Sequence, residues 1–184
     1  MRSLLVLMVL AVSTAFGVQA QPKDCGNCIP WSENYKLKWS DFEGKAQKYS
    51  PNEALTDSGM SIELKCDGKT SKAIVKCYFN PNNSWTKSKN SDYLLAHEQL
   101  HFDITELFVR KLRKQLAQFG DDCKALSKHI DDYYKRNYKE FVAYQDRYDR
   151  ETKHSLNEEK QAYWEKKVAK ELAELRDFAT LASN

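Results

Sequence analysis

The chain has 184 residues, with 29 Lys and Arg against 26 Asp and Glu, and a formal net charge of +3. A charge so nearly balanced offers no basic surface for nucleic-acid binding. Beyond its first residues, the sequence has no apolar run long enough to cross a membrane. We therefore expect a globular protein with neither a nucleic-acid partner nor a membrane span.

Residues 1–20 predict a signal peptide. Arg2 supplies a positive start, residues 4–12 are mostly apolar, and Val18-Gln19-Ala20 is a small-x-small cleavage site. The apolar run is shorter than a membrane-spanning helix requires. The mature protein is therefore expected to be secreted or periplasmic.

Five cysteines suit an oxidising compartment. Cys25 and Cys28 fall in a predicted irregular N-terminal arm, residues 21–34, where a loop staple or a tether is favoured over a redox pair. Cys66 and Cys77 point the same way as the apolar residues of their predicted strands, so we expect a disulfide between them. The odd number leaves at least one cysteine free or paired between chains.

The first part of the domain is predicted to be a small antiparallel sheet. Residues 35–42 alternate well enough between apolar and polar to form a strand. Residues 60–66 and 73–79 also alternate, and Asp67-Gly68-Lys69 separates them, which is typical of a β-hairpin. Asn80-Pro81-Asn82-Asn83 then ends the sheet.

The second part of the domain is predicted to be helical almost throughout. Three long helices are expected, from Ser91 or Asp92 to about Phe119, from Asp121 or Asp122 onward, and from the capping box Ser155-Leu156-Asn157-Glu158 onward. A short sheet followed by helices is typical of the α+β class. Residues 35–184 are therefore predicted to form one α+β domain.

The first helix carries the motif His97-Glu98-Gln99-Leu100-His101, an HExxH sequence. Residues four apart lie on one face of a helix, so the two imidazoles can chelate one zinc ion, and Glu98 lies beside them. The motif predicts the active-site helix of a zincin-like metallopeptidase.

The position of the motif on the helix supports a metal. His97, Glu98 and His101 fall within the apolar side of the helix or at its edge. The opposite side, with Gln99, Asp103, Arg110 and Lys114, is predicted to face solvent. Ionisable groups on the buried side need partners, and a divalent ion would satisfy all three. The alternative is a pair of core histidines hydrogen-bonded to their neighbours.

A catalytic zinc normally has a third protein ligand. The candidates are His129, Glu140, His154 and Glu158. His129 lies at the polar edge of the second helix and is most simply a surface residue. His154 lies in a tight turn between two helices and has no evident role in the core. It is the preferred third ligand, followed by Glu140 or Glu158.

This set of residues predicts metal-assisted hydrolysis of a peptide bond. Glu98 would be the general base that takes up a proton and later returns it to the leaving amine. Tyr148 could assist, although packing among the aromatic residues of its helix explains it equally well. Residues 73–79 could align a peptide substrate as a neighbouring strand.

Several segments together resemble one family of secreted bacterial proteins, predicted to be zinc-dependent proteases and of largely unknown function. The segments are Trp39-Ser40-Asp41-Phe42-Glu43-Gly44, residues 79–85, residues 95–104 around the HExxH motif, and residues 148–154 with Gln161 and Trp164. The resemblance implies that His154 is a site residue, because it matches the family's Tyr-Asp…Thr-x-His motif. The family usually has Gly after this His, whereas Ser155 follows it here.

Two functions from different classes are compatible with these residues. The first is a secreted zinc metallopeptidase acting on proteins or peptides. The second is a non-catalytic, zinc-stabilised periplasmic or surface binding protein, whose tyrosine-rich helices would serve for interaction. An open coordination position in a cleft favours the enzyme, and a site closed by four protein ligands favours the binding protein.

Overall fold

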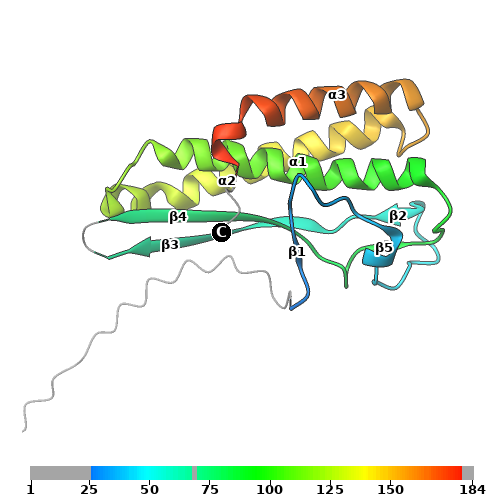
Figure 1. The fold of residues 1–184 in the computed structure, drawn as a ribbon, viewed down its shortest axis with the longest axis horizontal. Coiled ribbons are helices and arrows are strands. Elements are labelled where there is room, and N and C mark those ends of the chain that lie inside the picture. The colour runs from blue at the N-terminus through cyan, green and yellow to red at the C-terminus, as the bar shows by residue number, and fades with distance from the viewer. Residues whose placement is uncertain (1–25, 68–69, 180–184) are drawn as a thin grey trace, which may run out of the picture.

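The computed structural model describes residues 26–67 and 70–179, so the predicted signal peptide and Cys25 lie outside the described residues. The elements are β1 (Ile29–Pro30), η1 (Trp39–Asp41), β2 (Ala54–Leu55), β3 (Ser58–Cys66), β4 (Ser71–Phe79), β5 (Trp85–Thr86), α1 (Asp92–Ala117), α2 (Cys123–Thr152), α3 (Glu158–Glu174) and η2 (Arg176–Phe178). The three long helices lie together on one side of the β3–β4 hairpin (Figure 1). Strands precede helices, so the predicted α+β arrangement is confirmed.

The hairpin is the main part of the sheet, as its alternating pattern predicted. Strands β3 and β4 pair antiparallel from Ser58 opposite Phe79 to Cys66 opposite Ser71. Strand β1 adds to the other side of β4, giving the order β1-β4-β3, and β2 pairs with β5 in a separate two-stranded sheet. Met60 and Cys77 face each other on the side of the hairpin that packs into the core.

The strand predicted at residues 35–42 is absent. This segment contains only the short helix η1, and the strand that joins β4 is β1, nearer the N-terminus. Asp41 explains the local turn, because its carboxylate accepts hydrogen bonds from the Lys38 N–H (2.8 Å) and from the Tyr35 hydroxyl (2.9 Å). A side chain that binds the nearby backbone in this way competes with strand pairing. The apolar alternation reflects burial of Leu37 and Trp39 without a ladder.

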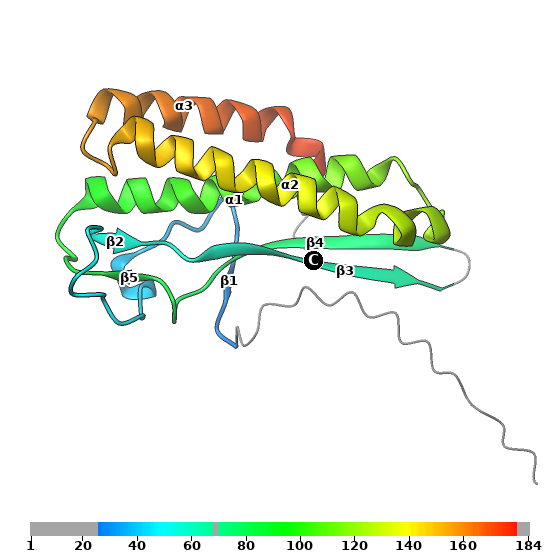
Figure 2. The ribbon, with the colours of Figure 1, turned by 180° about the vertical axis from the view of Figure 1, so that it is seen from behind.

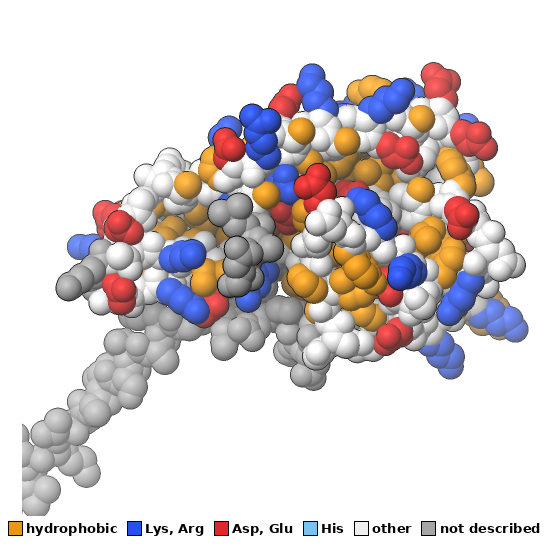
Figure 3. All heavy atoms as spheres, in the orientation of Figure 1, with side chains coloured by type: hydrophobic (Ala, Val, Ile, Leu, Met, Phe, Trp, Pro, Cys, Tyr) orange, Lys and Arg blue, Asp and Glu red, His pale blue; other side chains and the backbone are white. Residues whose placement is uncertain are grey.

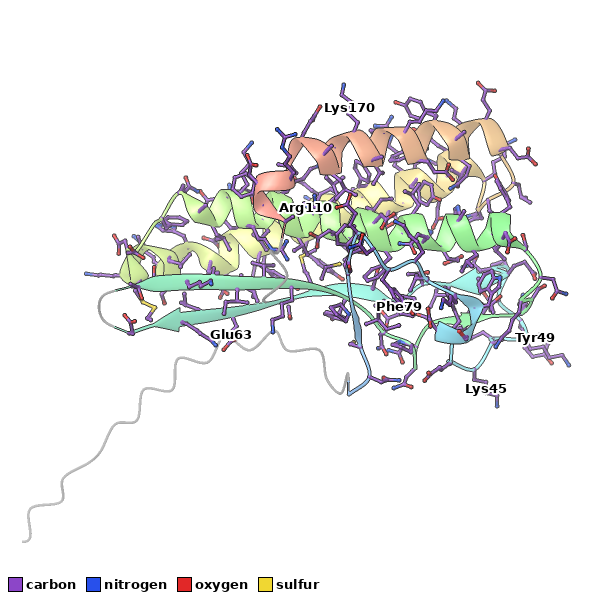
Figure 4. The ribbon with its side chains drawn as sticks, in the orientation of Figure 1. Lys45, Tyr49, Glu63, Phe79, Arg110 and Lys170 are labelled. Carbon is purple, nitrogen blue, oxygen red and sulfur yellow. A yellow bond between two sulfur atoms is a disulfide. The ribbon has the colours of Figure 1, made fainter. Side chains whose placement is uncertain are left out.

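Helix α1 is the centre of the core, and it lies between the hairpin and the other two helices (Figure 2). Ile104, Leu107, Val109 and Leu112 on α1 are completely buried. Phe79 at the end of β4 is also completely buried and packs on Phe102 of α1 with ring centroids 5.8 Å apart (Figure 4). A larger share of α1 is buried than of α2 or α3.

The prediction that this side of α1 faces solvent is wrong for Arg110, which is buried, whereas Gln99 and Asp103 are half-buried and Lys114 is exposed. Arg110 is 5% exposed and donates from Nε to Glu106 (2.9 Å). The N-terminal segment covers this side of α1, because Trp31 donates to the Asp103 carboxylate (2.7 Å) and stacks under the Arg110 guanidinium (Figure 4). Helical periodicity alone cannot reveal that a distant segment covers a polar face.

The outer surface matches the balanced composition. Lys and Arg side chains are interspersed with Asp and Glu side chains over the face shown in Figure 3. Within residues 26–67 and 70–179, no helix is both long and apolar enough to span a membrane.

Side-chain caps define the helix starts. Ser91 accepts from Leu94 N–H at α1, Asp122 from Ala125 N–H at α2, and Asn157 from Lys160 N–H at α3. The predicted capping box at residues 155–158 is therefore wrong by two residues. Ser155 cannot cap α3, because Lys153, His154 and Ser155 all have positive φ (52°, 51° and 71°) and form a left-handed turn between α2 and α3.

The expected Cys66–Cys77 disulfide is also wrong. Cys66 pairs with Cys123 at the start of α2, and Cys77 is a buried free thiol. In the hairpin Cys66 lies opposite Ser71 whereas Cys77 lies opposite Met60, so the two cysteines are separated along the strands. A shared side-chain direction does not bring two sulfurs within bonding distance. Cys28 is disulfide-bonded as well.

The disulfide leads to a first prediction. Non-reducing peptide mapping of the exported protein should recover Cys66 linked to Cys123, with Cys77 alkylated only after unfolding. Because the bridge closes a loop across a sequence separation of 57, the Cys66→Ser/Cys123→Ser variant should lose about 2–4 kcal/mol of unfolding free energy. Recovery of a Cys66–Cys77 peptide would contradict the structure.

Candidate metal site

Helices α1 and α2 bring three metal-ligating side chains together. His97 and His101 come from α1, and Asp149 comes from the last turns of α2. Their ligand atoms all lie within 4.8 Å of one another, and they form the one such group of three among the described residues. The Asp149 Oδ1 atom lies 3.2 Å from His97 Nε2 and 3.1 Å from His101 Nε2.

These distances fit a divalent metal ion. In a tetrahedral site with bonds of about 2.0–2.1 Å, neighbouring ligand atoms are roughly 3.3 Å apart. The two nitrogen–oxygen distances come close to that value. Two imidazoles with one carboxylate are also a donor set used by catalytic sites that keep a fourth position open. The His97–His101–Asp149 group could therefore hold a metal ion.

The orientation of His101 is set by Gln145 on α2. The Gln145 amide nitrogen donates to the His101 carbonyl oxygen (2.9 Å), so its Oε1 faces His101 Nδ1 at 2.7 Å. Nδ1 therefore carries the proton and donates to Gln145, which directs Nε2 toward Asp149. Partners of this kind hold a histidine ring in the tautomer and direction that a metal requires.

The orientation of His97 is set in the same way by α3. Gln161 donates from its amide nitrogen to Glu165 (3.0 Å), so its Oε1 faces His97 Nδ1 at 3.1 Å. The Tyr148 hydroxyl donates to the same Gln161 oxygen (2.7 Å) and also lies 2.7 Å from His97 Nδ1. Gln161 and Tyr148 are almost completely buried, so this arrangement is shielded from water.

Tyr148 is a supporting residue of His97. Its ring stacks on the imidazole of His97 with centroids 4.7 Å apart, and its side chain is 0% exposed. Burial raises the pKa of Tyr148 well above its usual range, so the side chain stays a neutral phenol. It does not line the cleft described below, which leaves packing and hydrogen bonding to His97 as its evident role.

Asp149 and His101 carry opposite charges at the site, and each shifts the pKa of the other. Burial by itself lowers the pKa of His101, but the hydrogen bond and charge of Asp149, together with the charge of Glu98, raise it to about 9. Burial raises the pKa of Asp149, and the hydrogen bonds from His101 and His97 more than offset this, so that it falls well below its usual range. At neutral pH a proton on His101 is therefore held against the Asp149 carboxylate.

Glu98 lies in the same place as the three ligands. Its side chain is 4% exposed and lines the cleft beside His97 and His101. Its charge is close enough to raise the pKa of His101. Among the described residues, none donates a hydrogen bond to the Glu98 carboxylate, which leaves this group available to a ligand in the cleft.

The other predicted candidates lie farther from the three ligand atoms. His154 is 64% exposed, and its Nδ1 lies 3.7 Å from Asp149 Oδ1, so it borders the site without joining the compact group. His129 is half-buried and stacks on Phe119 near the opposite end of α2. Glu140 is exposed on α2, and Glu158 lies at the edge of the cleft. The assignment of His154 as a ligand stays a prediction.

Sequence reasoning missed Asp149 and Gln145. Both lie on the buried stripe of α2, between Phe141 and Thr152, which are buried. Two polar residues one turn apart on an otherwise apolar stripe are a usable signal, because buried polar groups need partners. The sequence candidates are two histidines and two glutamates and do not include Asp149, although it is the Asp of the Tyr-Asp…Thr-x-His motif.

The metal-ligating group lies in an open cleft of about 800 Å³. Its walls are residues 51–56 with β2, the first turns of α1, the end of α2 and the turn at residues 153–156. The strand expected to align a substrate, residues 73–79, is the central strand β4 of the sheet and does not line this cleft. Strand β2 borders the cleft in its place.

Strand β2 has one unpaired edge. The Lys87 N–H donates to the Glu53 carbonyl (2.8 Å), so the next pair, Ala54 opposite Thr86, is a non-hydrogen-bonded pair of the ladder. The N–H and C=O of Ala54 therefore point away from β5. Ala54 lines the cleft and is 6% exposed, whereas no residue of β5 lines it.

Comparison with known proteins gives one family match. A family described as "Bacterial protein of unknown function (DUF922)" matches residues 79–155. The matched segment contains all of α1 and α2, with His97, His101, Asp149 and His154. No curated protein and no solved structure matches the chain. The match supports the resemblance to a bacterial family of unknown function, and its description names no activity.

The ligand assignment can be tested by substitution. Removing a residue that only orients a metal ligand typically weakens metal binding by roughly 10–100-fold, and Gln145→Leu is the control for this effect. We expect Asp149→Ala to weaken binding of a divalent ion by more than Gln145→Leu does, because it removes a ligand. His154→Ala should change the affinity less than Gln145→Leu does. Titration with Co²⁺, followed by its absorption spectrum, measures all three. Equal losses for His154→Ala and Asp149→Ala would instead make His154 a ligand.

Metal binding should also depend on pH. Below about pH 9 a metal must displace the proton held on His101, whereas Asp149 is already ionised. Affinity should therefore rise by about tenfold per pH unit between pH 6 and 8, because each step upward removes the competing proton. Co²⁺ affinities across this range, together with calorimetry in buffers of different ionisation enthalpy, measure the proton released. An affinity independent of pH would contradict the raised pKa of His101.

Proposed function

We propose that the protein is an exported zinc-dependent peptidase. The observation that carries the proposal is the placement of two imidazoles and two carboxylates, from His97, His101, Asp149 and Glu98, at one end of an open cleft. His97, His101 and Asp149 would hold the zinc ion. When bound, zinc supplies Lewis acidity, which lowers the pKa of a coordinated water and stabilises negative charge on a carbonyl oxygen.

Glu98 is the general base in this proposal. It lies on the same turn of α1 as His97 and is not part of the ligand group. Its carboxylate faces the cleft and receives no hydrogen bond from the described residues, so it can take a proton from water and return it to the leaving amine. Asp149 cannot fill this role as easily, because both histidines hydrogen-bond to it.

The unpaired edge of β2 favours a peptide as substrate. An extended peptide lying in the cleft would pair with the Ala54 N–H and C=O, which point away from β5. The same pairing would bring the peptide backbone alongside the first turns of α1, which carry His97 and Glu98. Recognition through the backbone would allow many substrate sequences to bind.

Export is supported by two independent features. The N-terminal residues have the pattern of a signal peptide. The disulfide between Cys66 and Cys123 is of the kind that persists in oxidising compartments. The substrates of the peptidase would then be secreted, surface or periplasmic proteins.

One observation favours the alternative of a non-catalytic, metal-stabilised binding protein. His154 lies 3.7 Å from Asp149, and a small movement of its side chain would add a fourth protein ligand. Such a site would be closed, and the metal would then serve stability alone. The exposure of His154 and the open cleft beside it favour the enzyme.

Glu98→Gln separates the two functions. We expect this variant to keep its fold and one zinc per chain, because Glu98 is not in the ligand group. Peptide hydrolysis should fall by a factor of roughly 10² or more, the usual scale for loss of a general base. Hydrolysis of an unfolded-protein substrate is measured on the zinc-loaded protein, with Glu159→Gln, an exposed residue of α3, as the matched control. Absence of cleavage by the wild type, or equal rates for Glu98→Gln, would reject the peptidase.

A further inference from the structure

Large apolar side chains gather around the mouth of the cleft. Among the described residues seven large hydrophobic side chains are exposed, and three of them line this cleft. Leu55 comes from β2 and Tyr93 from the first turn of α1, each 37% exposed, and Leu156 comes from the turn before α3, at 82% exposed. The buried part of the same cleft is lined by the ionisable side chains of His97, Glu98, His101 and Asp149. The apolar side chains therefore surround the place where a substrate would meet the metal group.

Leu156 is held in its exposed position by the backbone. It follows Lys153, His154 and Ser155, which all adopt left-handed conformations that residues with a Cβ disfavour. Hydrogen bonds fix this turn, from the His154 N–H to the Asp149 carbonyl (2.9 Å) and from the Asn157 N–H to the Thr152 carbonyl (2.8 Å).

Packing of the helices accounts for the reversal of the chain at residues 153–155, but it does not account for an exposed leucine at the end of this turn. Strain of this kind persists where the surrounding structure enforces it, and it is concentrated at sites that bind ligands. Leu156 does not pack against the core, and none of the residues that the structure describes buries it. The backbone therefore holds Leu156 exposed at the mouth of the cleft.

We propose that the cleft selects peptides that carry a large apolar side chain next to the cleaved bond, and that Leu156, Leu55 and Tyr93 contact this side chain. The proposal rests on the peptidase function proposed above. An extended peptide is the occupant that fits, because Ala54 lines the cleft with its N–H and C=O directed away from β5, and alternate side chains of a paired strand point to opposite sides. One side chain of a peptide paired with β2 would then face the apolar rim.

The first experiment is a cleavage profile. The zinc-loaded wild type is incubated with a mixed peptide library, and Leu, Phe or Met is expected to be enriched on one side of the cut. For matched peptides with Leu or Ala at that position, Leu156→Ser should lower kcat/KM for the Leu peptide by about tenfold and leave the Ala peptide nearly unchanged. Tyr93→Ser should act in the same direction, whereas Tyr163→Ser, an exposed tyrosine of α3 outside the cleft, should not.

A binding measurement separates this proposal from the peptidase itself. Zinc-loaded Glu98→Gln protein is titrated with the fluorescently labelled Leu and Ala peptides, and anisotropy gives each Kd with and without Leu156→Ser. A preference for Leu that Leu156→Ser abolishes supports the proposal even if the wild type cleaves nothing, in which case only the peptidase fails. Cleavage without an apolar preference, or a Leu-to-Ala ratio unchanged by Leu156→Ser, overturns the proposal and leaves the peptidase intact.

Two further outcomes also overturn it. Leu156 could instead be covered by a second copy of the chain, in which case light scattering would show a dimer that Leu156→Ser dissociates. Binding of neither peptide, at concentrations where the metal site is fully loaded, would remove both the selectivity and the peptide occupant. Circular dichroism of each variant confirms that the comparison is between folded proteins.

Discussion

The Asp149 carboxylate between two imidazoles is the interaction on which the arrangement of the helices depends. Two histidines from α1 and a carboxylate from α2 are withdrawn from much of the solvent, and each would be costly to bury without the others. Because the pairing joins two helices, it aligns the end of α2 with the start of α1. The hydrogen bonds of Gln145 and Gln161 then leave each ring a single direction in which to point.

The left-handed turn between α2 and α3 follows from this requirement. Asp149 must lie near the end of α2, and Gln161 on α3 must reach back to His97, so the chain has to reverse direction within a few residues. Buried packing of Trp164 on Tyr148, with ring centroids 5.5 Å apart, stabilises the reversal. The unfavourable φ angles at residues 153–155 are thus offset by tertiary contacts on both sides. A consequence is that His154 and Leu156 stand at the mouth of the cleft.

The cleft combines ionisable side chains with exposed apolar side chains. Its floor has the ionisable groups of α1 and α2, and its rim has exposed apolar side chains and a strand edge with unpaired backbone groups. Charged groups on a partly buried floor act strongly on a bound carbonyl, since little water screens them. Apolar and backbone contacts at the rim suit an extended peptide. In the proposed peptidase, recognition and chemistry would therefore be served by different parts of one site.

The sequence alone determined the local elements and half of the site. The alternation at residues 60–66 and 73–79 predicted the hairpin, Ser91 and Asp122 marked two helix starts, and the HExxH spacing placed His97 and His101 on one face. These features follow from interactions between residues close together in the chain. Tertiary structure decided the rest, since each missed feature joins distant segments. Asp149 contacts histidines about fifty residues earlier in the chain. Cys66 forms its disulfide with Cys123 and not with Cys77, and Trp31 covers the polar side of α1. Periodicity gives the direction of a side chain on its own element, whereas only the packing of elements decides which groups meet.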